Sequence, residues 1–147
     1  MTTKRFRCAA VSIGSKINVF GGNDDCYNTV SSCKFYDITT QECTQLSKME
    51  EKRICCAATA VGNKKYIDSG RDGYKCHSSC EVFDTSTNIW TSILNMFEIK
   101  SGCQAVSIFS KLVAMGGWNH STTHSSVKVF DTSTDKSILP QEKERLE

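Results

Sequence analysis

The sequence predicts an all-β fold built from three copies of one four-stranded antiparallel sheet, and two repeated features support this prediction. The first is an aromatic residue followed by Asp, within the phrases KFYDITT, EVFDTST and KVFDTST; the Asp residues lie 47 residues apart, at Asp37, Asp84 and Asp131. The second is a doublet that ends in Gly, at Gly21-Gly22, Ser69-Gly70 and Gly116-Gly117. A period in the forties with such a signature is typical of propeller blades and of other stacked β units.

Length and charge limit the classes of function. A chain of 147 residues, 39% of them hydrophobic, is long enough for one packed domain. The net charge of +2, from 18 basic and 16 acidic residues, favours neither nucleic acid nor a membrane surface as a partner. Residues 1–14 lack the apolar region of a signal peptide, and no apolar run approaches the roughly 18 residues of a spanning helix. We therefore expect a cytoplasmic protein.

Each unit opens with a basic residue, and two predicted strands follow it. The basic residues are Arg5, Arg53 and Lys100. The first strands are rich in small side chains, which suit a crowded position near a propeller axis; they span residues 8–13, 56–61 and 103–108. After a short turn, the second strands span residues 16–20, 65–67 and 111–115 and end at the doublet. The missing Cβ of Gly allows a positive φ there and close approach by another segment.

A polar loop of varied sequence separates the doublet from the third strand in each unit: NDDCYNT, RDGYKCHS and WNHSTTHS. The third strand ends at the aromatic-Asp pair, where the carboxylate can accept hydrogen bonds from the amides of the following turn. The fourth strands are predicted at residues 42–46, 88–93 and 136–139, with Trp90 in the middle unit where Cys43 and Ser137 stand in the others. Four short antiparallel strands at this period match a β-propeller blade.

With these motifs in register over almost the whole chain, the sequence resembles kelch repeats, and within that family the repeats of the kelch-like proteins. The resemblance places blade 1 at about residues 1–49, blade 2 at about 50–96 and blade 3 at about 97–140, before a charged tail at 141–147. The sequence departs from the family pattern at three positions of the repeat. The Trp of the family is present only in the middle unit, as Trp90, and the second doublet begins with Ser69. The Pro that is expected after the aromatic-Asp pair is replaced by Ile38, Thr85 and Thr132. These departures affect blade geometry more than blade identity.

Three blades are fewer than a complete ring, because propellers usually contain about four to eight. Each terminal blade would then present an uncovered face and an edge liable to mispair. Two explanations stay open. The chain is a fragment or a short gene product, or it associates with another copy, so that two three-blade halves form a six-blade ring.

The nine cysteines favour buried, reduced thiols. Their number is odd, and several occupy repeat positions: Cys8, Cys56 and Cys103 share one, and Cys33 and Cys80 share another. Free Cys packs as a small hydrophobe, and reduced thiols suit the cytosol. The spacings Cys76 to Cys80 and His120 to His124 do not form the two close pairs of a structural zinc site. We therefore predict no metal and no other cofactor, while redox activity of the loop cysteines stays open.

No group of residues predicts catalysis. His77 and His120 are not accompanied by a fitting Ser or Cys motif, and the repeated Asp residues are explained as turn acceptors. Some kelch-fold proteins are metal-carrying oxidases, but no Tyr and His arrangement here supports that analogy. We therefore predict that the chain is not an enzyme.

Recognition of another protein is the predicted function. Loops that leave the second strands and loops that join the blades should gather on one face of a rigid scaffold, where variable residues form a binding surface. The predicted partner-binding residues are Arg5, Asn23, Tyr27, Arg53, Arg71, Tyr74, Lys100, Trp118 and His120. Arg can bind a carboxylate through two hydrogen bonds, and Tyr and Trp are common interface anchors.

The resemblance to kelch-like proteins implies two roles that these residues do not separate. In the first, the face captures a protein or peptide substrate for a cullin-based ubiquitin ligase, which such proteins recruit through BTB and BACK regions. This sequence contains neither region, so it would bind without recruiting the ligase and could compete with a full-length kelch-like relative. In the second, the propeller binds actin or organises a cytoskeletal complex.

Overall fold

The structure, a computed structural model, describes residues 3–93 and 100–138, which form twelve β-strands in three sheets. The first sheet contains β1 (Ala9–Ile13), β2 (Lys16–Phe20), β3 (Cys33–Asp37) and β4 (Glu42–Leu46). The second contains β5 (Ala57–Val61), β6 (Lys64–Asp68), β7 (Cys80–Asp84) and β8 (Ile89–Ile93). The third contains β9 (Gln104–Ile108), β10 (Lys111–Met115), β11 (Val127–Asp131) and β12 (Lys136–Ile138). The described residues include no helix long and apolar enough to cross a membrane.

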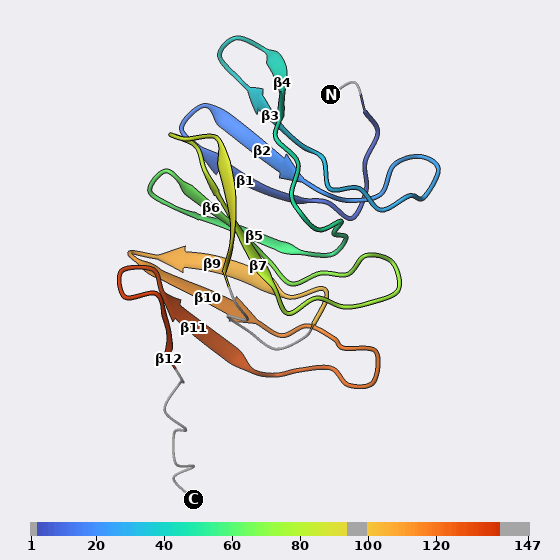
Figure 1. The fold of residues 1–147 in the computed structure, drawn as a ribbon, viewed down its shortest axis with the longest axis vertical. Helices are drawn as coiled ribbons and strands as arrows, with labels where there is room; N and C mark the ends of the chain where they lie inside the picture. Colours follow the sequence, from blue (N-terminus) through green and yellow to red (C-terminus); the bar gives the residue numbers. More distant parts are fainter. Residues whose placement is uncertain (1–2, 94–99, 139–147) are drawn as a thin grey trace, which may run out of the picture.

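Each sheet is an antiparallel meander in which every strand pairs with the next one along the chain. The three sheets stack on one another (Figure 1), and we call them blade 1, blade 2 and blade 3 in chain order. The predicted all-β fold of three four-stranded blades is confirmed. β2 and β10 have the predicted bounds, and β6 extends beyond the predicted residues 65–67 at both ends. Residue 139 and the predicted tail at 141–147 lie outside the described residues.

The two faces of each blade differ in what they contact, because successive side chains of a strand point to opposite sides of the sheet. We call the face toward the following blade the front face, and the opposite one the back face. The front of blade 1 supplies Ala9, Phe20 and Cys33, which form one buried cluster with Ile67 from the back of blade 2. Burial of such side chains contributes about 1.5–3 kcal/mol for each large one.

Trp90 completes this layer between blades 1 and 2. Its ring centroid lies 5.9 Å from that of Phe20 and 5.0 Å from that of Phe83, and its Nε1 donates a hydrogen bond to Ser47 O. In blades 1 and 3 the same position holds Cys43 and Ser137, and both are exposed. The Trp of the middle unit therefore covers the outer end of an apolar layer.

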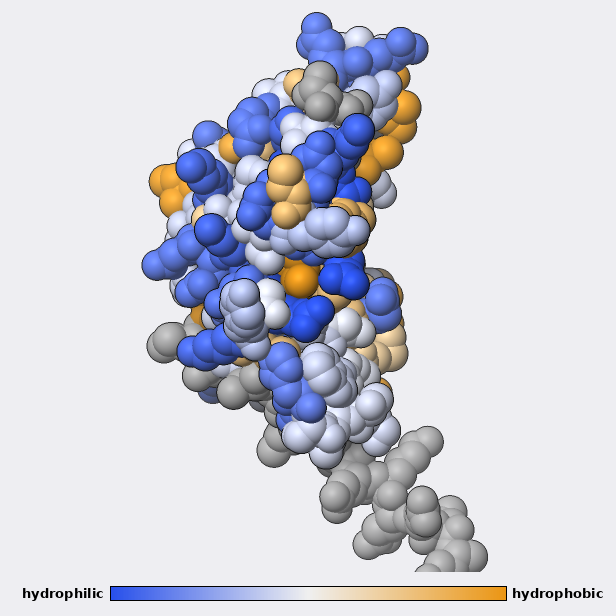
Figure 2. Space-filling model, turned by 90° about the vertical axis from the view of Figure 1, so that its right-hand side faces the viewer, coloured by the Kyte–Doolittle hydropathy of each residue, from blue (hydrophilic) through white to orange (hydrophobic). Residues whose placement is uncertain are grey.

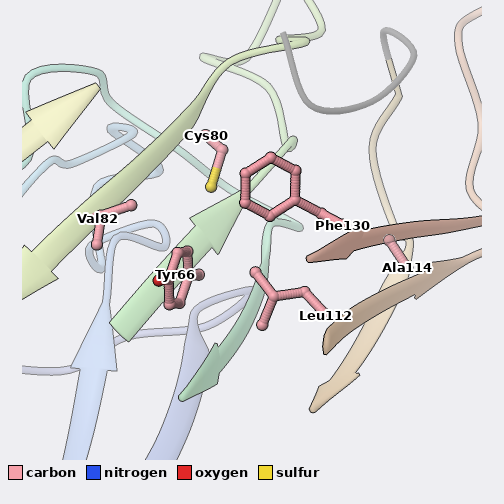
Figure 3. Packing of buried hydrophobic residues seen from close by; sticks show 6 residues of the cluster. All are labelled: Tyr66, Cys80, Val82, Leu112, Ala114 and Phe130. Carbon is pink, nitrogen blue, oxygen red and sulfur yellow. The ribbon is translucent and has the colours of Figure 1, made fainter. Parts of the chain in front are cut away.

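A second buried cluster joins blades 2 and 3. Figure 3 shows its six members, which are Tyr66, Cys80, Val82, Leu112, Ala114 and Phe130. The first three come from the front of blade 2 and the last three from the back of blade 3. Blade 2 is thus covered on both faces, as its largely buried β6 and β7 show.

The repeated Asp residues close the turns between the third and fourth strands, as predicted. Asp84 Oδ1 accepts hydrogen bonds from Ser86 N and Ser86 Oγ, and Asp131 does the same with Ser133. These hydrogen bonds lower the pKa of Asp84 and Asp131 below the ordinary value. The carboxylates are therefore used as turn acceptors.

The glycine doublets bring successive blades into backbone contact. Gly22 N donates to Arg53 O at 2.8 Å, and Gly70 N donates to Lys100 O at 3.0 Å, so the doublets of blades 1 and 2 bond to the opening residue of the next blade. Gly70 has a φ of 89°, and a Cβ added there would lie 2.9 Å from Ile54 O. The backbone conformation and the close approach both require glycine.

Candidate binding surface

The loops that follow the doublets, at residues 21–32, 69–79 and 116–126, project from the same side of the stack (Figure 1). We call this side the loop face. Figure 2 views it directly: the surface is mostly hydrophilic, and a small hydrophobic spot lies near its middle. A face of this kind combines polar and apolar contacts, as protein interfaces do.

Backbone hydrogen bonds hold the start of each loop in place. The residue after the doublet pairs with the chain just before its own blade: Arg71 N donates to Ile54 O at 3.0 Å, and Trp118 N donates to Ser101 O at 2.9 Å. Arg71 also forms a β-bridge with Cys76 across the loop. The side chains of these loops are therefore presented by a fixed backbone, which lowers the entropy cost of binding.

Two predicted tyrosines line one groove between the loops of blades 1 and 2. Tyr27 is 77% exposed and Tyr74 is 94% exposed. The groove has a volume of about 400 Å³, and its other lining residues are Asn28, Thr29, Lys52, Asp72 and Gly73. We call it the tyrosine groove. Its two exposed phenol rings offer apolar area together with hydroxyl groups for hydrogen bonding.

Arg71 and Trp118 line a second cavity, between the loops of blades 2 and 3. This cavity, the Arg71–Trp118 pocket, has a volume of about 340 Å³, and its other lining residues are Cys55, Ser101, Gly102, Gly117 and Thr123. The Arg71 guanidinium makes no ion pair with any residue that the structure describes. The lining of this pocket therefore combines a large aromatic ring with a cation that has no ion pair among the described residues.

His120 extends this pocket toward a thiol. Its ring centroid lies 4.7 Å from that of Trp118, and its Nε2 lies 3.1 Å from Cys76 Sγ. Burial raises the pKa of the Cys76 thiol, which keeps it protonated at neutral pH. A protonated, buried thiol is a poor nucleophile, so the pair supports the position of the His120 ring.

Comparison with known families settles what kind of scaffold carries these cavities. The KLHDC2/KLHL20/DRC7 Kelch-repeats domain matches residues 1–143. The chain belongs to the kelch-repeat family. The family fold is a protein-interaction fold, and the kelch resemblance noted from the motifs is confirmed.

Individual kelch proteins match shorter stretches. Kelch-like protein 25 of Rattus norvegicus is 39% identical over 69 residues, and the human Kelch-like protein 25 is 38% identical over 69 residues. Each match covers 47% of this chain and 11% of the relative. An F-box/kelch-repeat protein of Arabidopsis thaliana is 40% identical over 57 residues, which cover 39% of this chain and 14% of that protein. The chain thus corresponds to a small part of these relatives.

Four of the nine predicted partner-binding residues lie in the framework of the kelch repeats. Arg53 and Lys100 have no exposed surface, and Asn23 is 4% exposed. The Asn23 side-chain amide donates to Tyr27 O, which fixes the loop of blade 1. The half-buried Arg5 donates to Gly21 O and to Ser32 O and Oγ. Burial keeps Asn23, Arg53 and Lys100 from contact with a partner, and the half-buried Arg5 guanidinium already donates to acceptors of its own blade. The five residues on the loop face remain as predicted binding residues.

The Arg53 side chain shows what the opening cation does. Its Nε donates to Glu81 Oε1 at 3.1 Å, its Nη1 donates to Ser69 O and Ser79 O, and its Nη2 donates to Ser79 Oγ at 2.6 Å. Glu81 also accepts from Glu50 N and Glu51 N. This buried network fastens the segment before blade 2 to the blade itself.

Several residues of the two cavities escaped the sequence analysis. Lys52 and Thr29 line the tyrosine groove, and Cys55 and Thr123 line the Arg71–Trp118 pocket. The sequence could have indicated the unusual backbone at Cys55, because the residue at the same repeat position in blade 3 is Gly102. Both residues have positive φ. Glycine at one copy of a repeat position indicates an unusual backbone conformation there.

The described residues contain one close group of metal-ligand types, Asp24, Asp25 and Cys26 in the loop of blade 1. Asp24 is already an acceptor for Cys26 N, Asn28 N and Asn28 Nδ2. These hydrogen bonds, above all that from the Asn28 side chain, lower the pKa of Asp24. The group is accounted for as a turn.

Proposed function

We propose that the loop face binds a protein partner through the Arg71–Trp118 pocket. The observation that carries this proposal is a guanidinium without a described carboxylate partner at the edge of a cavity that Trp118 lines. Such a site suits an exposed segment that inserts an apolar or aromatic side chain and places a carboxylate on Arg71. The tyrosine groove, on the adjacent pair of loops, would contact the same segment farther along.

We further propose that the partner belongs to the substrates of kelch-like adaptors of cullin-based ubiquitin ligases, and that the chain acts in the cytoplasm. The similarity to Kelch-like protein 25 supports this choice.

The experiment is an affinity capture under reducing conditions, followed by titration of each captured protein against purified variants. Trp118→Ala and Arg71→Ala should each weaken binding of a true partner by about 2 kcal/mol, or about thirtyfold in Kd, as for other interface anchors. Lys75→Ala is the matched control, because Lys75 is an exposed cation of the same loop that lines neither cavity. Equal affinity of all variants would reject the pocket as the binding site.

The identity of the captured protein separates the adaptor role from the cytoskeletal one. A protein that also binds a full-length kelch-like relative supports the adaptor role. Cosedimentation of the chain with filamentous actin, weakened by the loop-face variants, would support the actin-binding scaffold in its place.

A further inference from the structure

Two sheet faces at the ends of the stack have no neighbouring blade among the described residues, and both carry apolar side chains. The front of blade 3 exposes hydrophobic side chains that strand register places on one face: Val106, Ile108, Met115, Val127 and Ile138. Val113 and Val129 lie between them and are half-buried. On the back of blade 1, Ile17 is 37% exposed and lies opposite Tyr36, with Val19 beside them.

These end faces use the repeat positions that are buried at the two inner junctions. On front faces, Val113 of blade 3 corresponds to Tyr66 of blade 2, and Met115 corresponds to Asp68. On back faces, Ile17 of blade 1 corresponds to Lys65 of blade 2. Each end of the chain thus carries one half of an inter-blade junction.

At one repeat position, the chemistry of each inner junction is matched between its two halves. At the junction of blades 1 and 2, Lys65 Nζ donates to Asn18 Oδ1 at 2.7 Å, so a polar residue meets a polar one. At the junction of blades 2 and 3 the same two positions hold Tyr66 and Leu112, which share an apolar cluster. The corresponding residues at the open ends are Val113 and Ile17.

Two further pairs of side chains that pack across the inner junctions also have apolar counterparts at the open ends. Phe20 and Ile67 pack together between blades 1 and 2, and their counterparts at the open ends are Met115 and Val19. Val82 and Phe130 pack together between blades 2 and 3, and their counterparts are Val129 and Tyr36. All three pairs at the open ends are therefore suited to apolar packing with one another.

The backbone at the two ends is complementary as well. Gly22 N and Gly70 N donate to the carbonyl of the next opening residue. The corresponding amide of blade 3 is Gly117 N, for which no backbone acceptor is found among the described residues, and the corresponding carbonyl is Arg5 O. The open ends can thus supply the donor and the acceptor of one more inter-blade bond.

We propose that a second copy of this chain covers both ends: the front of blade 3 in each copy packs on the back of blade 1 in the other. The product is a closed ring of six blades with a twofold axis. Two junctions form at once, which removes the apolar side chains of both end faces from water. The proposal concerns faces that are separate from the loop face and does not depend on the proposed function.

The test is the molar mass of the 147-residue chain by light scattering over a wide range of concentration. The proposal expects twice the 16.3 kDa of one chain. Met115→Lys and Val19→Glu, each alone, should yield monomers, because each buries a charge without a partner at both junctions. An equimolar mixture of the two variants should recover a dimer, since one junction then pairs Lys with Glu and the other is unchanged.

The control is Phe109→Asp, at a side chain that is 96% exposed in the turn between β9 and β10 and outside the strands whose side chains form the end faces; it should remain a dimer. Circular dichroism of each variant checks that the blades are folded. A monomeric wild-type chain at all concentrations overturns the proposal. So do open filaments, a dimer that survives both single charges, or a mixture that stays monomeric. If the charged variants do not fold, cross-linking of the wild-type chain decides: the absence of cross-links between blade 1 and blade 3 of different copies would overturn it.

Discussion

Blades 2 and 3 carry different cations at the same repeat position, and both side chains are fully buried. In blade 2 the Arg53 guanidinium bonds to two backbone carbonyls, to Ser79 and to Glu81. In blade 3 the Lys100 Nζ has no hydrogen-bond partner among the described residues, and the same holds for Ser126 Oγ, the counterpart of Ser79 Oγ. One ammonium group on a shorter, flexible stem does not reproduce the rigid five-donor fork of Arg.

Both opening cations are therefore part of the framework of their blades, but only Arg53 is held there by hydrogen bonds. The opening cation of blade 2 has a hydrogen-bond partner for each of its nitrogen atoms, and this blade has a neighbour on each face. The opening cation of blade 3 has no partner among the described residues, and the front of this blade exposes apolar side chains. A buried polar atom without a partner costs about 1–3 kcal/mol, so Lys100 stabilises its blade less than Arg53 does. Four predictions test this difference between the blades.

Arg53→Ala should have the largest effect, a loss of about 3–5 kcal/mol in the free energy of unfolding, because it leaves the buried Glu81 carboxylate without its counter-charge. Urea unfolding followed by circular dichroism measures the loss. Lys75→Ala, at an exposed cation of the same blade, should change stability by less than about 0.5 kcal/mol. Similar small effects for both would contradict a structural role for Arg53.

Asp68, at the border of blades 2 and 3, should make stability depend on pH. It is 3% exposed, and burial raises its pKa to about 6 from the ordinary 3.8. Between pH 3.8 and about 6, Asp68 has lost its proton in the unfolded chain but keeps it in the folded chain. The free energy of unfolding therefore falls as pH rises through this range. The difference between the two pKa values corresponds to about 3 kcal/mol.

Asp68→Asn removes this dependence. As pH rises from below 3.8 to above 6, the free energy of unfolding of the wild-type chain should fall by up to about 3 kcal/mol relative to that of Asp68→Asn. Asp37→Asn is a control with the opposite sign: the amide of Thr39 lowers the pKa of Asp37, so its contribution is lost as pH falls. A constant difference between wild type and Asp68→Asn across this range would show that Asp68 is not buried as described.

The doublets of blades 2 and 3 should differ in how well their second residue, Gly70 or Gly117, tolerates a Cβ. At Gly70 the added carbon would lie 2.9 Å from both Ile54 O and Cys56 Cβ, whereas at Gly117 its nearest neighbour is Lys100 Cδ at 3.0 Å. The Lys side chain is flexible and can move, but the backbone oxygen cannot. Gly70→Ala should therefore destabilise by about 1–2 kcal/mol more than Gly117→Ala, beyond the roughly 1–2 kcal/mol that positive φ costs both. Thermal unfolding of the two variants side by side measures this, and equal losses would refute it.

Lys100→Arg should have the smallest effect and the opposite sign. The new guanidinium could donate to Gly116 O, Ser126 O and Ser126 Oγ, as Arg53 does to its counterparts. We expect a gain of about 1 kcal/mol in urea unfolding. The reverse change in blade 2, Arg53→Lys, should lower the free energy of unfolding. If Lys100→Arg and Arg53→Lys both changed this free energy in the same direction, the proposed difference between the two cations would be wrong.

Much of the fold could be predicted because the repeat fixes it three times. The bounds of β2 and β10 follow from the alternating residues before the glycine doublet, and the turn role of Asp84 follows from the short carboxylate before Thr and Ser. A residue type that recurs at the same position of each repeat marks a structural feature that all three blades share. The repeat therefore predicts the strands and turns of the blades.

The candidate site was predicted only in part for the same reason. Arg53 and Lys100 recur at one position, and this recurrence indicates a framework role, because a variable binding surface does not need the same residue type in each unit. Tyr74 and Trp118 come from the loops that differ between units, and they do line cavities. The sequence could not indicate Lys52 or Thr123, because their places depend on how adjacent blades stack.

Residue-resolved amide hydrogen exchange tests the stacking of the blades most directly. The amides of Gly22, Cys55, Gly70 and Gly102 lie outside the strands, yet each donates to a carbonyl of an adjacent blade. We predict that these four amides exchange slowly, with the protection of the neighbouring strands, while the amide of Gly62 at the tip of the β5–β6 hairpin exchanges rapidly. Exchange of the four as fast as that of Gly62 would contradict the account, because the blades would then not be joined through these bonds.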